Sequence, residues 1–256
     1  MGHILHTETC DSHTEKQFLP GKLAEYHGLH HCETIIVCGC GASLNELKNP
    51  EFFITIGVND VGRLFDPTYL VVVNPRRQFK DDRFHYVEES RAKAIFTQLD
   101  LGLKNHHIVR FTLGKRGGTD FSDPNVLHYT QNSPYVALCL AVHMGAKKIG
   151  LIGVDFTDNH FYGKTGRHNL AGQFGKIDME YKKLAESLKQ LGVEAYNLSS
   201  QSRLTAFPKA SIEDLRINSF GKKQQVPYSY KKKIFFVNYK FLSCGEVFTD
   251  GLKNAA

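Results

Sequence analysis

Short runs of almost entirely apolar residues, separated by longer polar segments, are the feature that most constrains how this chain can fold. The clearest runs are 34–38, 53–58, 69–73 and 148–152. Such runs are typical of parallel strands, because a parallel sheet in an α/β protein is covered on both faces. We therefore predict an α/β fold of the Rossmann-like, doubly wound type, with a mainly parallel sheet and helices on both faces.

Two of the polar segments carry helix signals. A helix over 134–144 is indicated by Ser133 at the cap position, by Pro134 in the first turn and by Gly145 after the end. A second, charged helix is predicted over 177–191. Strands that alternate with helices in this way favour a parallel sheet.

The length of 256 residues suits one main domain with a small appendage. We interpret 1–27 as a polar leader, 28–212 as a Rossmann-like nucleotide-binding domain and 213–232 as a basic linker. Residues 233–256 read as an orphan βα unit, too small to form a domain. This unit resembles the start of a second Rossmann-like domain; alternatively, its strand at 233–238 extends the edge of the main sheet.

Composition and charge narrow the class of protein. No apolar run approaches the roughly 20 residues that span a bilayer, and the N-terminal segment is polar and contains acidic residues, unlike a secretory signal. We therefore expect no membrane span and a cytoplasmic location. The net charge of +6 suits an anionic small ligand such as a nucleotide. Lysines gather between 222 and 233, where a solvated linker is a better explanation than a nucleic-acid patch.

The six cysteines do not show the paired spacing of a zinc site, and no metal site is predicted. Cys38 and Cys139 lie within apolar runs, where a free cysteine behaves as a small hydrophobic residue. Cysteines and histidines between 10 and 32 leave an adventitious metal site as an alternative to a plain polar leader.

Polar and glycine residues follow the predicted strands at their carboxyl ends. They are Gly39, Gly41, Ser43, Asn59, Asn74 and Asp155. In doubly wound sheets, ligands bind outside the carboxyl ends of the strands, near the point where the strand order reverses. The sequence therefore predicts a binding site at this edge of the sheet.

The turn from Gly39 to Ser43 is the best candidate for binding a nucleotide phosphate. Its glycines permit close backbone approach and positive φ angles, and the N-terminus of the following helix offers N–H groups to an anion. Leu44 stands where the dinucleotide fingerprint has its third glycine, and the Lys-Ser/Thr pair of a P-loop is missing. Both departures disfavour NAD binding and ordinary ATPase activity.

Four further residues have two interpretations each. Asn59 and Asn74 have amides able to hydrogen-bond a base or a ribose, or they cap the turns that follow. Ser133 either caps its helix or marks a helix N-terminus that meets a phosphate. Asp155 either binds a ribose or holds a neighbouring loop.

The candidate catalytic residues are His160, Tyr162 and His168, which share one loop. A histidine titrates near neutral pH and can take a proton from an acceptor hydroxyl. A tyrosine can donate a hydrogen bond to a departing phosphate oxygen. Because the chain has 13 histidines, chance placement is the alternative explanation.

The segment 28–44, GLHHCETIIVCGCGASL, resembles the opening of the MptE-like family, which is built around a G-x-G-x-S-L turn and includes 6-hydroxymethylpterin diphosphokinases. The same turn, together with Val58-Asn59, Val73-Asn74-Pro75, Asn132-Ser133, the Gly-Val-Asp-Phe of 153–156 and a late His-Asn, resembles the single-domain, metal-independent bacterial sialyltransferases. The ordered set covers roughly 28–205. Residues 233–256 resemble the start of CgeB-like glycosyltransferases.

The sialyltransferase resemblance implies roles for several of these residues. It implies that His168 is the catalytic base and that Tyr162 contacts the phosphate. The residues that it implies as nucleotide contacts are Gly39, Gly41, Ser43, Asn59 and Asn74. One departure is Ala42, which stands where those enzymes have a proline.

Taken together, these features predict a nucleotide-dependent transferase, most simply a glycosyltransferase-like enzyme with a nucleotide-sugar donor as substrate and no tightly bound cofactor. One alternative is pterin diphosphokinase-like diphosphoryl transfer, which would need ATP and Mg²⁺. Another is a non-catalytic module associated with a glycosyltransferase. The expected partners are a nucleotide-type small molecule and a glycan or glycosyltransferase.

Overall fold

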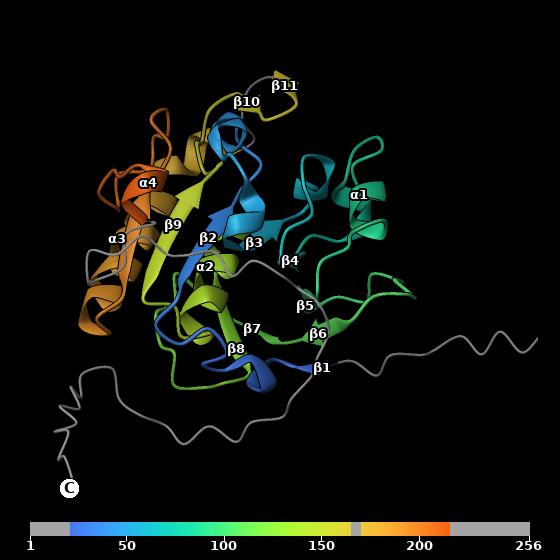
Figure 1. Cartoon of the computed structure of the whole chain (residues 1–256), viewed down its shortest axis with the longest axis horizontal. Helices are drawn as coiled ribbons and strands as arrows, with labels where there is room; N and C mark the ends of the chain where they lie inside the picture. The colour runs from blue at the N-terminus through green and yellow to red at the C-terminus, as the bar shows by residue number, and fades with distance from the viewer. Residues whose placement is uncertain (1–20, 165–169, 216–256) are drawn as a thin grey trace, which may run out of the picture.

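A computed structural model describes residues 21–164 and 170–215 of the chain. Its main element is an eight-stranded sheet in which all neighbouring strands pair in parallel (Figure 1). In spatial order the strands are β1 (Gly21–Lys22), β6 (Ile108–Arg110), β5 (Ile95–Thr97), β4 (Tyr69–Val71), β3 (Ile54–Val58), β2 (Thr34–Cys38), β9 (Lys148–Ile152) and β12 (Glu194–Asn197). The predicted α/β, Rossmann-like fold with a mainly parallel sheet is confirmed.

The strand order reverses between β2 and β9. From β2 the chain adds β3, β4, β5 and β6 in one direction, and it then returns to place β9 and β12 on the other side of β2. Ile35 of β2 pairs with Ile54 of β3 on one side and with Ile149 of β9 on the other. The carboxyl ends of β2 and β9 therefore meet at the switch point, where ligands bind in folds of this type.

Helix α2 (Ser133–His143) covers one face of the central strands β2, β3 and β4. It is apolar almost all round because its other side is covered too, by the small parallel sheet of β7 (Thr112–Arg116) and β8 (Val126–Tyr129) and by α3 (Phe174–Gln190). The rings of Tyr135 in α2 and Tyr181 in α3 meet edge to face at 5.0 Å.

The elements that cover the opposite face of the sheet are shorter. Successive side chains of a strand point to opposite faces, so Ile35 and Val37 belong to the core around α2, and Ile36 and Cys38 to a second core. The 3₁₀ helices are η1 (Leu23–Tyr26), η2 (Ala42–Glu46), η3 (Pro50–Phe52), η4 (Val61–Arg63), η5 (Arg76–Gln78) and η6 (Ala171–Gln173). The remaining elements are α1 (His85–Glu88), α4 (Ile212–Leu215) and the hairpin strands β10 (Asn159–His160) and β11 (Gly163–Lys164).

Two helix starts differ from the sequence-based expectation. The residue at the N-cap of α2 is Asn132, and Ser133 is the first helical residue. The segment after Gly41 is a 3₁₀ helix of five residues and does not continue as an α-helix. At the beginning of the described chain, Gly21–Lys22 pairs with β6 and Leu23 is fully buried, so the fold begins before the boundary at 27 that the sequence suggested.

Several sequence-based expectations lie outside the described residues. These are most of the predicted leader, most of the basic linker, the βα unit at 233–256 and the candidate base His168. Within the described part, no helix combines the length and the apolar character needed to cross a membrane.

Candidate functional site

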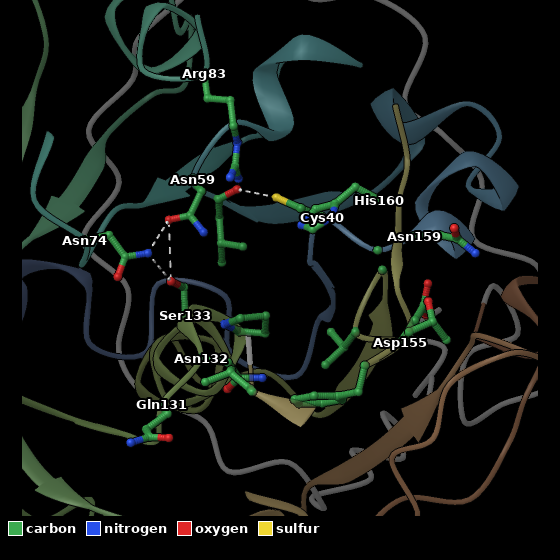
Figure 2. Close-up of a pocket in the computed structure, with 18 residues that line it drawn as sticks. Cys40, Asn59, Asn74, Arg83, Gln131, Asn132, Ser133, Asp155, Asn159 and His160 are labelled. Atoms are coloured by element: carbon green, nitrogen blue, oxygen red, sulfur yellow. Dashed lines mark hydrogen bonds between the residues drawn. The ribbon is translucent and has the colours of Figure 1, made fainter. Parts of the chain in front are cut away.

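A pocket of about 200 Å³ opens at the switch point, beside the carboxyl ends of β2, β3 and β9 (Figure 2). The N-terminus of α2 and the start of the β10–β11 hairpin complete its walls. The residues that the sequence analysis singled out and that line this pocket are Gly41, Asn59, Asn74, Ser133, Asp155 and His160. Residues from five separate parts of the sequence therefore meet in one cavity.

Gly39 and Gly41 bring the turn after β2 against the end of β9. A Cβ atom on Gly39 would lie 2.3 Å from the carbonyl oxygen of Gly153, and one on Gly41 would lie 2.5 Å from Oδ2 of Asp155. The Gly41 N–H donates to the Gly153 carbonyl at 2.7 Å. Neither glycine has a positive φ, contrary to the sequence-based expectation; Gly153 has one, at +70°. Glycine is needed at 39 and 41 because a Cβ atom would overlap the Gly153 carbonyl at both positions and the Asp155 carboxylate at 41.

Ser43 and Asp155 form a buried bracket between the two strand ends. The Ser43 hydroxyl donates to Oδ1 of Asp155 at 2.6 Å, and the Ser43 N–H donates to Oδ2 at 2.8 Å. The Gly153 N–H in turn donates to the Ser43 hydroxyl oxygen at 2.9 Å. Ser43 is absent from the pocket lining, and Asp155 is only 1% exposed. Of the two interpretations of Asp155, this geometry matches the one in which it holds a neighbouring segment.

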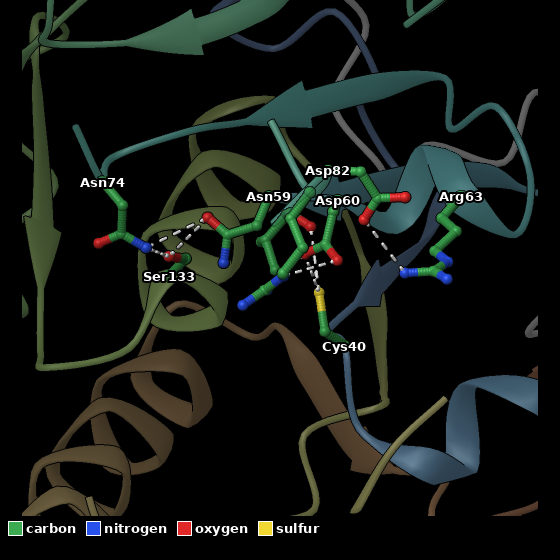
Figure 3. Close-up of polar contacts among 9 residues, drawn as sticks. Cys40, Asn59, Asp60, Arg63, Asn74, Asp82 and Ser133 are labelled. Atoms are coloured by element: carbon green, nitrogen blue, oxygen red, sulfur yellow. Dashed lines mark hydrogen bonds and ion pairs between the residues drawn. The ribbon is translucent and has the colours of Figure 1, made fainter. Parts of the chain in front are cut away.

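Three polar side chains from three elements converge on the other wall of the pocket (Figures 2 and 3). The Asn74 amide donates to Oδ1 of Asn59 at 3.2 Å and to the Ser133 hydroxyl at 3.4 Å. The Ser133 hydroxyl lies 3.5 Å from the same Asn59 oxygen. Asn59 adopts a left-handed conformation, with φ at +53°, which asparagine tolerates better than most residues. We call Asn59, Asn74 and Ser133 the amide cluster.

The N-terminus of α2 adjoins the amide cluster. The Asn132 side chain does not cap the helix; its Oδ1 accepts a hydrogen bond from the Tyr181 hydroxyl at 3.0 Å. Pro134 has no N–H, and within the described chain the Ser133 and Tyr135 N–H groups have no hydrogen-bond acceptor. Unpaired N–H groups and the positive end of the helix dipole favour an anion at this position.

Cys40 and Asp60, which both follow predicted strands, form a polar group with Arg83, a residue that the sequence analysis did not assign to the site. Figure 3 shows Cys40 beside Asp60. Arg83 donates from Nε to Oδ2 of Asp60 at 2.9 Å and from Nη2 to Oδ1 at 2.5 Å. The Cys40 thiol lies 3.6 Å from Oδ1 of Asp60. Burial and the nearby Asp60 carboxylate raise the pKa of Cys40 well above its ordinary value, so the thiol stays protonated. Arg83 follows no periodic pattern, and nothing in the sequence marks it as a pocket residue.

The hairpin of β10 and β11 carries two of the three predicted catalytic residues. His160 lines the pocket, and its ring stacks on that of Tyr162 at 5.3 Å between ring centroids. Tyr162 is not part of the lining; the Arg63 guanidinium lies over its ring at 4.7 Å. Burial raises the pKa of Tyr162, so its hydroxyl is protonated at neutral pH. The Phe161 N–H ties the hairpin to the Cys40 carbonyl at 3.1 Å.

Two further observations complete the chemistry of the pocket. The hydroxyl oxygen of Thr157 in its lining is buried without a hydrogen-bond partner in the part of the chain that is described. Over the same part, no three histidine, cysteine, aspartate or glutamate side chains come together as they would in a metal site. The pocket offers amide, hydroxyl and guanidinium groups, which hydrogen-bond to polar organic ligands and to anions.

No family model matches the chain, and no curated protein matches its sequence. Among solved structures, the MAf glycosyltransferase from Magnetospirillum magneticum AMB-1 matches with a TM-score of 0.50 at 12% sequence identity, over 76% of this chain and 38% of that chain. This chain thus spans well under half of that enzyme.

The sialyltransferase CstII from Campylobacter jejuni, in complex with cytidine-5'-monophosphate, matches with a TM-score of 0.43 at 15% identity, over 71% of this chain and 86% of that one. The α-2,3-sialyltransferase Cst-I from the same organism matches with a TM-score of 0.42 at 15% identity, over 81% and 90%. At these identities the similarity concerns the fold, and the MptE-like resemblance of residues 28–44 stays a prediction.

Proposed function

We propose that this chain is a glycosyltransferase-like transferase that binds a nucleotide-sugar donor in the pocket between the ends of β2 and β9. The observation that carries the proposal is the convergence of the amide cluster with the unpaired N–H groups of the α2 N-terminus in one cavity at the switch point. A nucleotide needs this combination, because its base and ribose offer hydrogen-bonding groups and its phosphate is an anion.

The proposed binding mode places the nucleoside against Asn59 and Asn74 and the phosphate at the start of α2. The free donors and acceptors of the two amides are suited to the edge of a base or to ribose hydroxyls. Ser133 contributes its hydroxyl to the amide cluster and its N–H to the phosphate. In this arrangement Gly41 lines the wall, and Gly39, Ser43 and Asp155 keep the walls of the pocket in place.

The proposed reaction is transfer of the sugar to an acceptor hydroxyl. The acceptor oxygen forms a bond to the anomeric carbon as the bond from that carbon to the phosphate oxygen breaks, and the nucleotide leaves with the electron pair. A base takes the proton of the acceptor hydroxyl; His168 is the first candidate and His160 the second. Tyr162, held in its protonated form, stays the sequence-based candidate donor to the departing phosphate oxygen, although it does not line the pocket in this structure.

The test is calorimetric titration of the purified chain with cytidine and uridine nucleotides and their nucleotide sugars. We expect micromolar affinity for one of them. Asn74→Ala should weaken that affinity by about tenfold, the effect of losing roughly 1.4 kcal/mol of hydrogen bonding. Asn105→Ala, at an exposed position outside the pocket, is the matched control and should change nothing. If no nucleotide or nucleotide sugar produces heat, the proposal is wrong.

Substitution of His168 separates an enzyme from a module that only binds. His168→Ala should lower the transfer rate by at least ~10²-fold, the usual scale of general-base catalysis, while nucleotide affinity stays unchanged. An unchanged rate would remove His168 from the mechanism, and the same comparison with His160→Ala would then test the second candidate. A strict requirement for ATP and Mg²⁺ would instead favour diphosphoryl transfer.

A further inference from the structure

Arg83 is the one lysine or arginine among the described residues that line the pocket. It lies on the segment between η5 and α1, and its side chain is 22% exposed. Figure 2 shows it on a different wall of the pocket from Asn132 and Ser133 at the start of α2. A group bound between these two walls would meet a guanidinium on one side and helix N–H groups on the other.

The hydrogen bonds of Arg83 use only one edge of its guanidinium. Asp60 accepts from Nε and Nη2, which form the side edge of the group. The end edge, formed by Nη1 and the second N–H of Nη2, has no acceptor within the described chain. This free edge has the two-pronged geometry that matches the oxygens of a phosphate.

Asp60 fixes the position of Arg83 before any ligand arrives. The Asp60 carboxylate is completely buried, and an unpaired buried carboxylate is strongly unfavourable, so the pair is expected to stay together. Burial alone would lower the pKa of Arg83. Its hydrogen bonds and charge attraction with Asp60 outweigh this effect, so the pKa of Arg83 lies above its ordinary value. The cation is therefore permanent and held in one orientation.

We infer that the free edge of Arg83, held in place by Asp60 as a positioning residue, binds the phosphate of the nucleotide from the wall that faces the start of α2. This inference rests on the proposed function and adds a phosphate-binding cation to it. The nearby Arg63 is not equivalent, because it is absent from the pocket lining and its Nη1 lies 3.7 Å from the exposed carboxylate of Asp82.

The experiment compares nucleotides with their uncharged nucleosides, since Arg83 should act on the phosphate alone. The probes are cytidine and uridine 5'-monophosphates, titrated by calorimetry, and cytidine and uridine, titrated by NMR shift changes that detect millimolar binding. Because R83Q alone would leave Asp60 buried and unpaired, the main variant is D60N/R83Q. The second is R83K, which keeps a cation beside Asp60 but lacks the free edge.

We expect D60N/R83Q to weaken nucleotide binding by roughly 10- to 100-fold, the range for losing hydrogen bonds to a charged group. R83K should also weaken it, by a smaller factor, and both variants should leave nucleoside affinity as in the wild type. R63Q is the matched control and should bind nucleotides normally. Thermal melting verifies that each variant is folded. If the double variant is unfolded, the comparison of R83K with the wild type is the test.

Three outcomes would overturn the inference. Nucleotide affinity unchanged in both Arg83 variants would show that the phosphate does not use this residue. Equal losses for nucleotide and nucleoside would show that Arg83 only maintains the shape of the pocket. A wild-type chain that binds nucleosides and nucleotides equally would place the phosphate outside the pocket. If the wild-type chain binds neither, the proposed function itself fails, and this inference fails with it.

Discussion

The bracket between Ser43 and Asp155 gives the sharpest prediction about stability. Replacing Ser43 with alanine removes a hydroxyl that does two things at once. It donates to Oδ1 of the buried Asp155 carboxylate at 2.6 Å, and it accepts from the Gly153 N–H at 2.9 Å. The Ser43 N–H would keep its bond to Oδ2, so the variant isolates the contribution of the side chain.

The expected cost follows from the burial of these groups. Loss of a hydrogen bond to a carboxylate costs about 1.5–3 kcal/mol, and leaving a buried N–H without an acceptor costs about 1–3 kcal/mol. Asp155 is 1% exposed and Ser43 is 1% exposed, so water cannot readily replace the lost partner. We expect Ser43→Ala to lower the free energy of unfolding by about 3–5 kcal/mol, which corresponds to a Tm lower by about 6–20 °C.

The assay is urea denaturation followed by circular dichroism, with Ser211→Ala as the matched control. Ser211 donates to Oδ2 of Asp214 from its N–H and from its hydroxyl, each at 2.8 Å, but this pair is exposed. Its loss should cost about 1 kcal/mol, the usual effect of removing a helix cap. If Ser43→Ala costs no more than Ser211→Ala, the reasoning from burial is refuted.

Two further predictions concern the fold. Gly39→Ala should lower the free energy of unfolding by about 1–3 kcal/mol or more, because the new Cβ would overlap the Gly153 carbonyl. Gly172→Ala, where a Cβ meets nothing within 4 Å, should be neutral in the same urea assay. Burial lowers the pKa of His143 below 6.5, so the unfolded chain binds a proton that the folded chain excludes. Stability should therefore fall below about pH 6.5, by up to about 1.4 kcal/mol per pH unit. His143→Gln should flatten this dependence and His85→Gln at an exposed position should not; equal profiles would contradict it.

The strands that bear the site could be predicted from the sequence because each is a continuous apolar run. Strands β2 and β9 were predicted at 34–38 and 148–152, and the structure has the same limits. Their adjacency follows from the reversal of strand order in doubly wound sheets. The convergence of Asn59 and Asn74 follows as well, since both lie at the carboxyl ends of neighbouring strands, and Ser133 joins them from the start of α2.

The partners of these residues could not be predicted, because they depend on contacts between distant segments. Ser43 meets Asp155, 112 positions further along the chain, and no local pattern encodes that pair. Arg83 was missed because it lies on a segment without periodicity, and its role depends on the burial of Asp60. A run such as Gly-x-Gly-x-Ser predicts a tight turn, but it does not reveal what fills the space beside the turn.

The Asp155 carboxylate also changes where a phosphate is expected to bind. In the sequence-based interpretation the phosphate meets the N–H groups after Gly41. In the structure Asp155 already accepts the Ser43 N–H there, and a second anion at the same point would be repelled by a buried negative charge. Among the described residues, the N–H groups at the start of α2 have no acceptor, and Arg83 lines the same cavity with a guanidinium edge that has none either. In the proposed function we therefore expect the bracket to affect specificity as well as stability, by disfavouring an anionic ligand at the β2 turn relative to the start of α2.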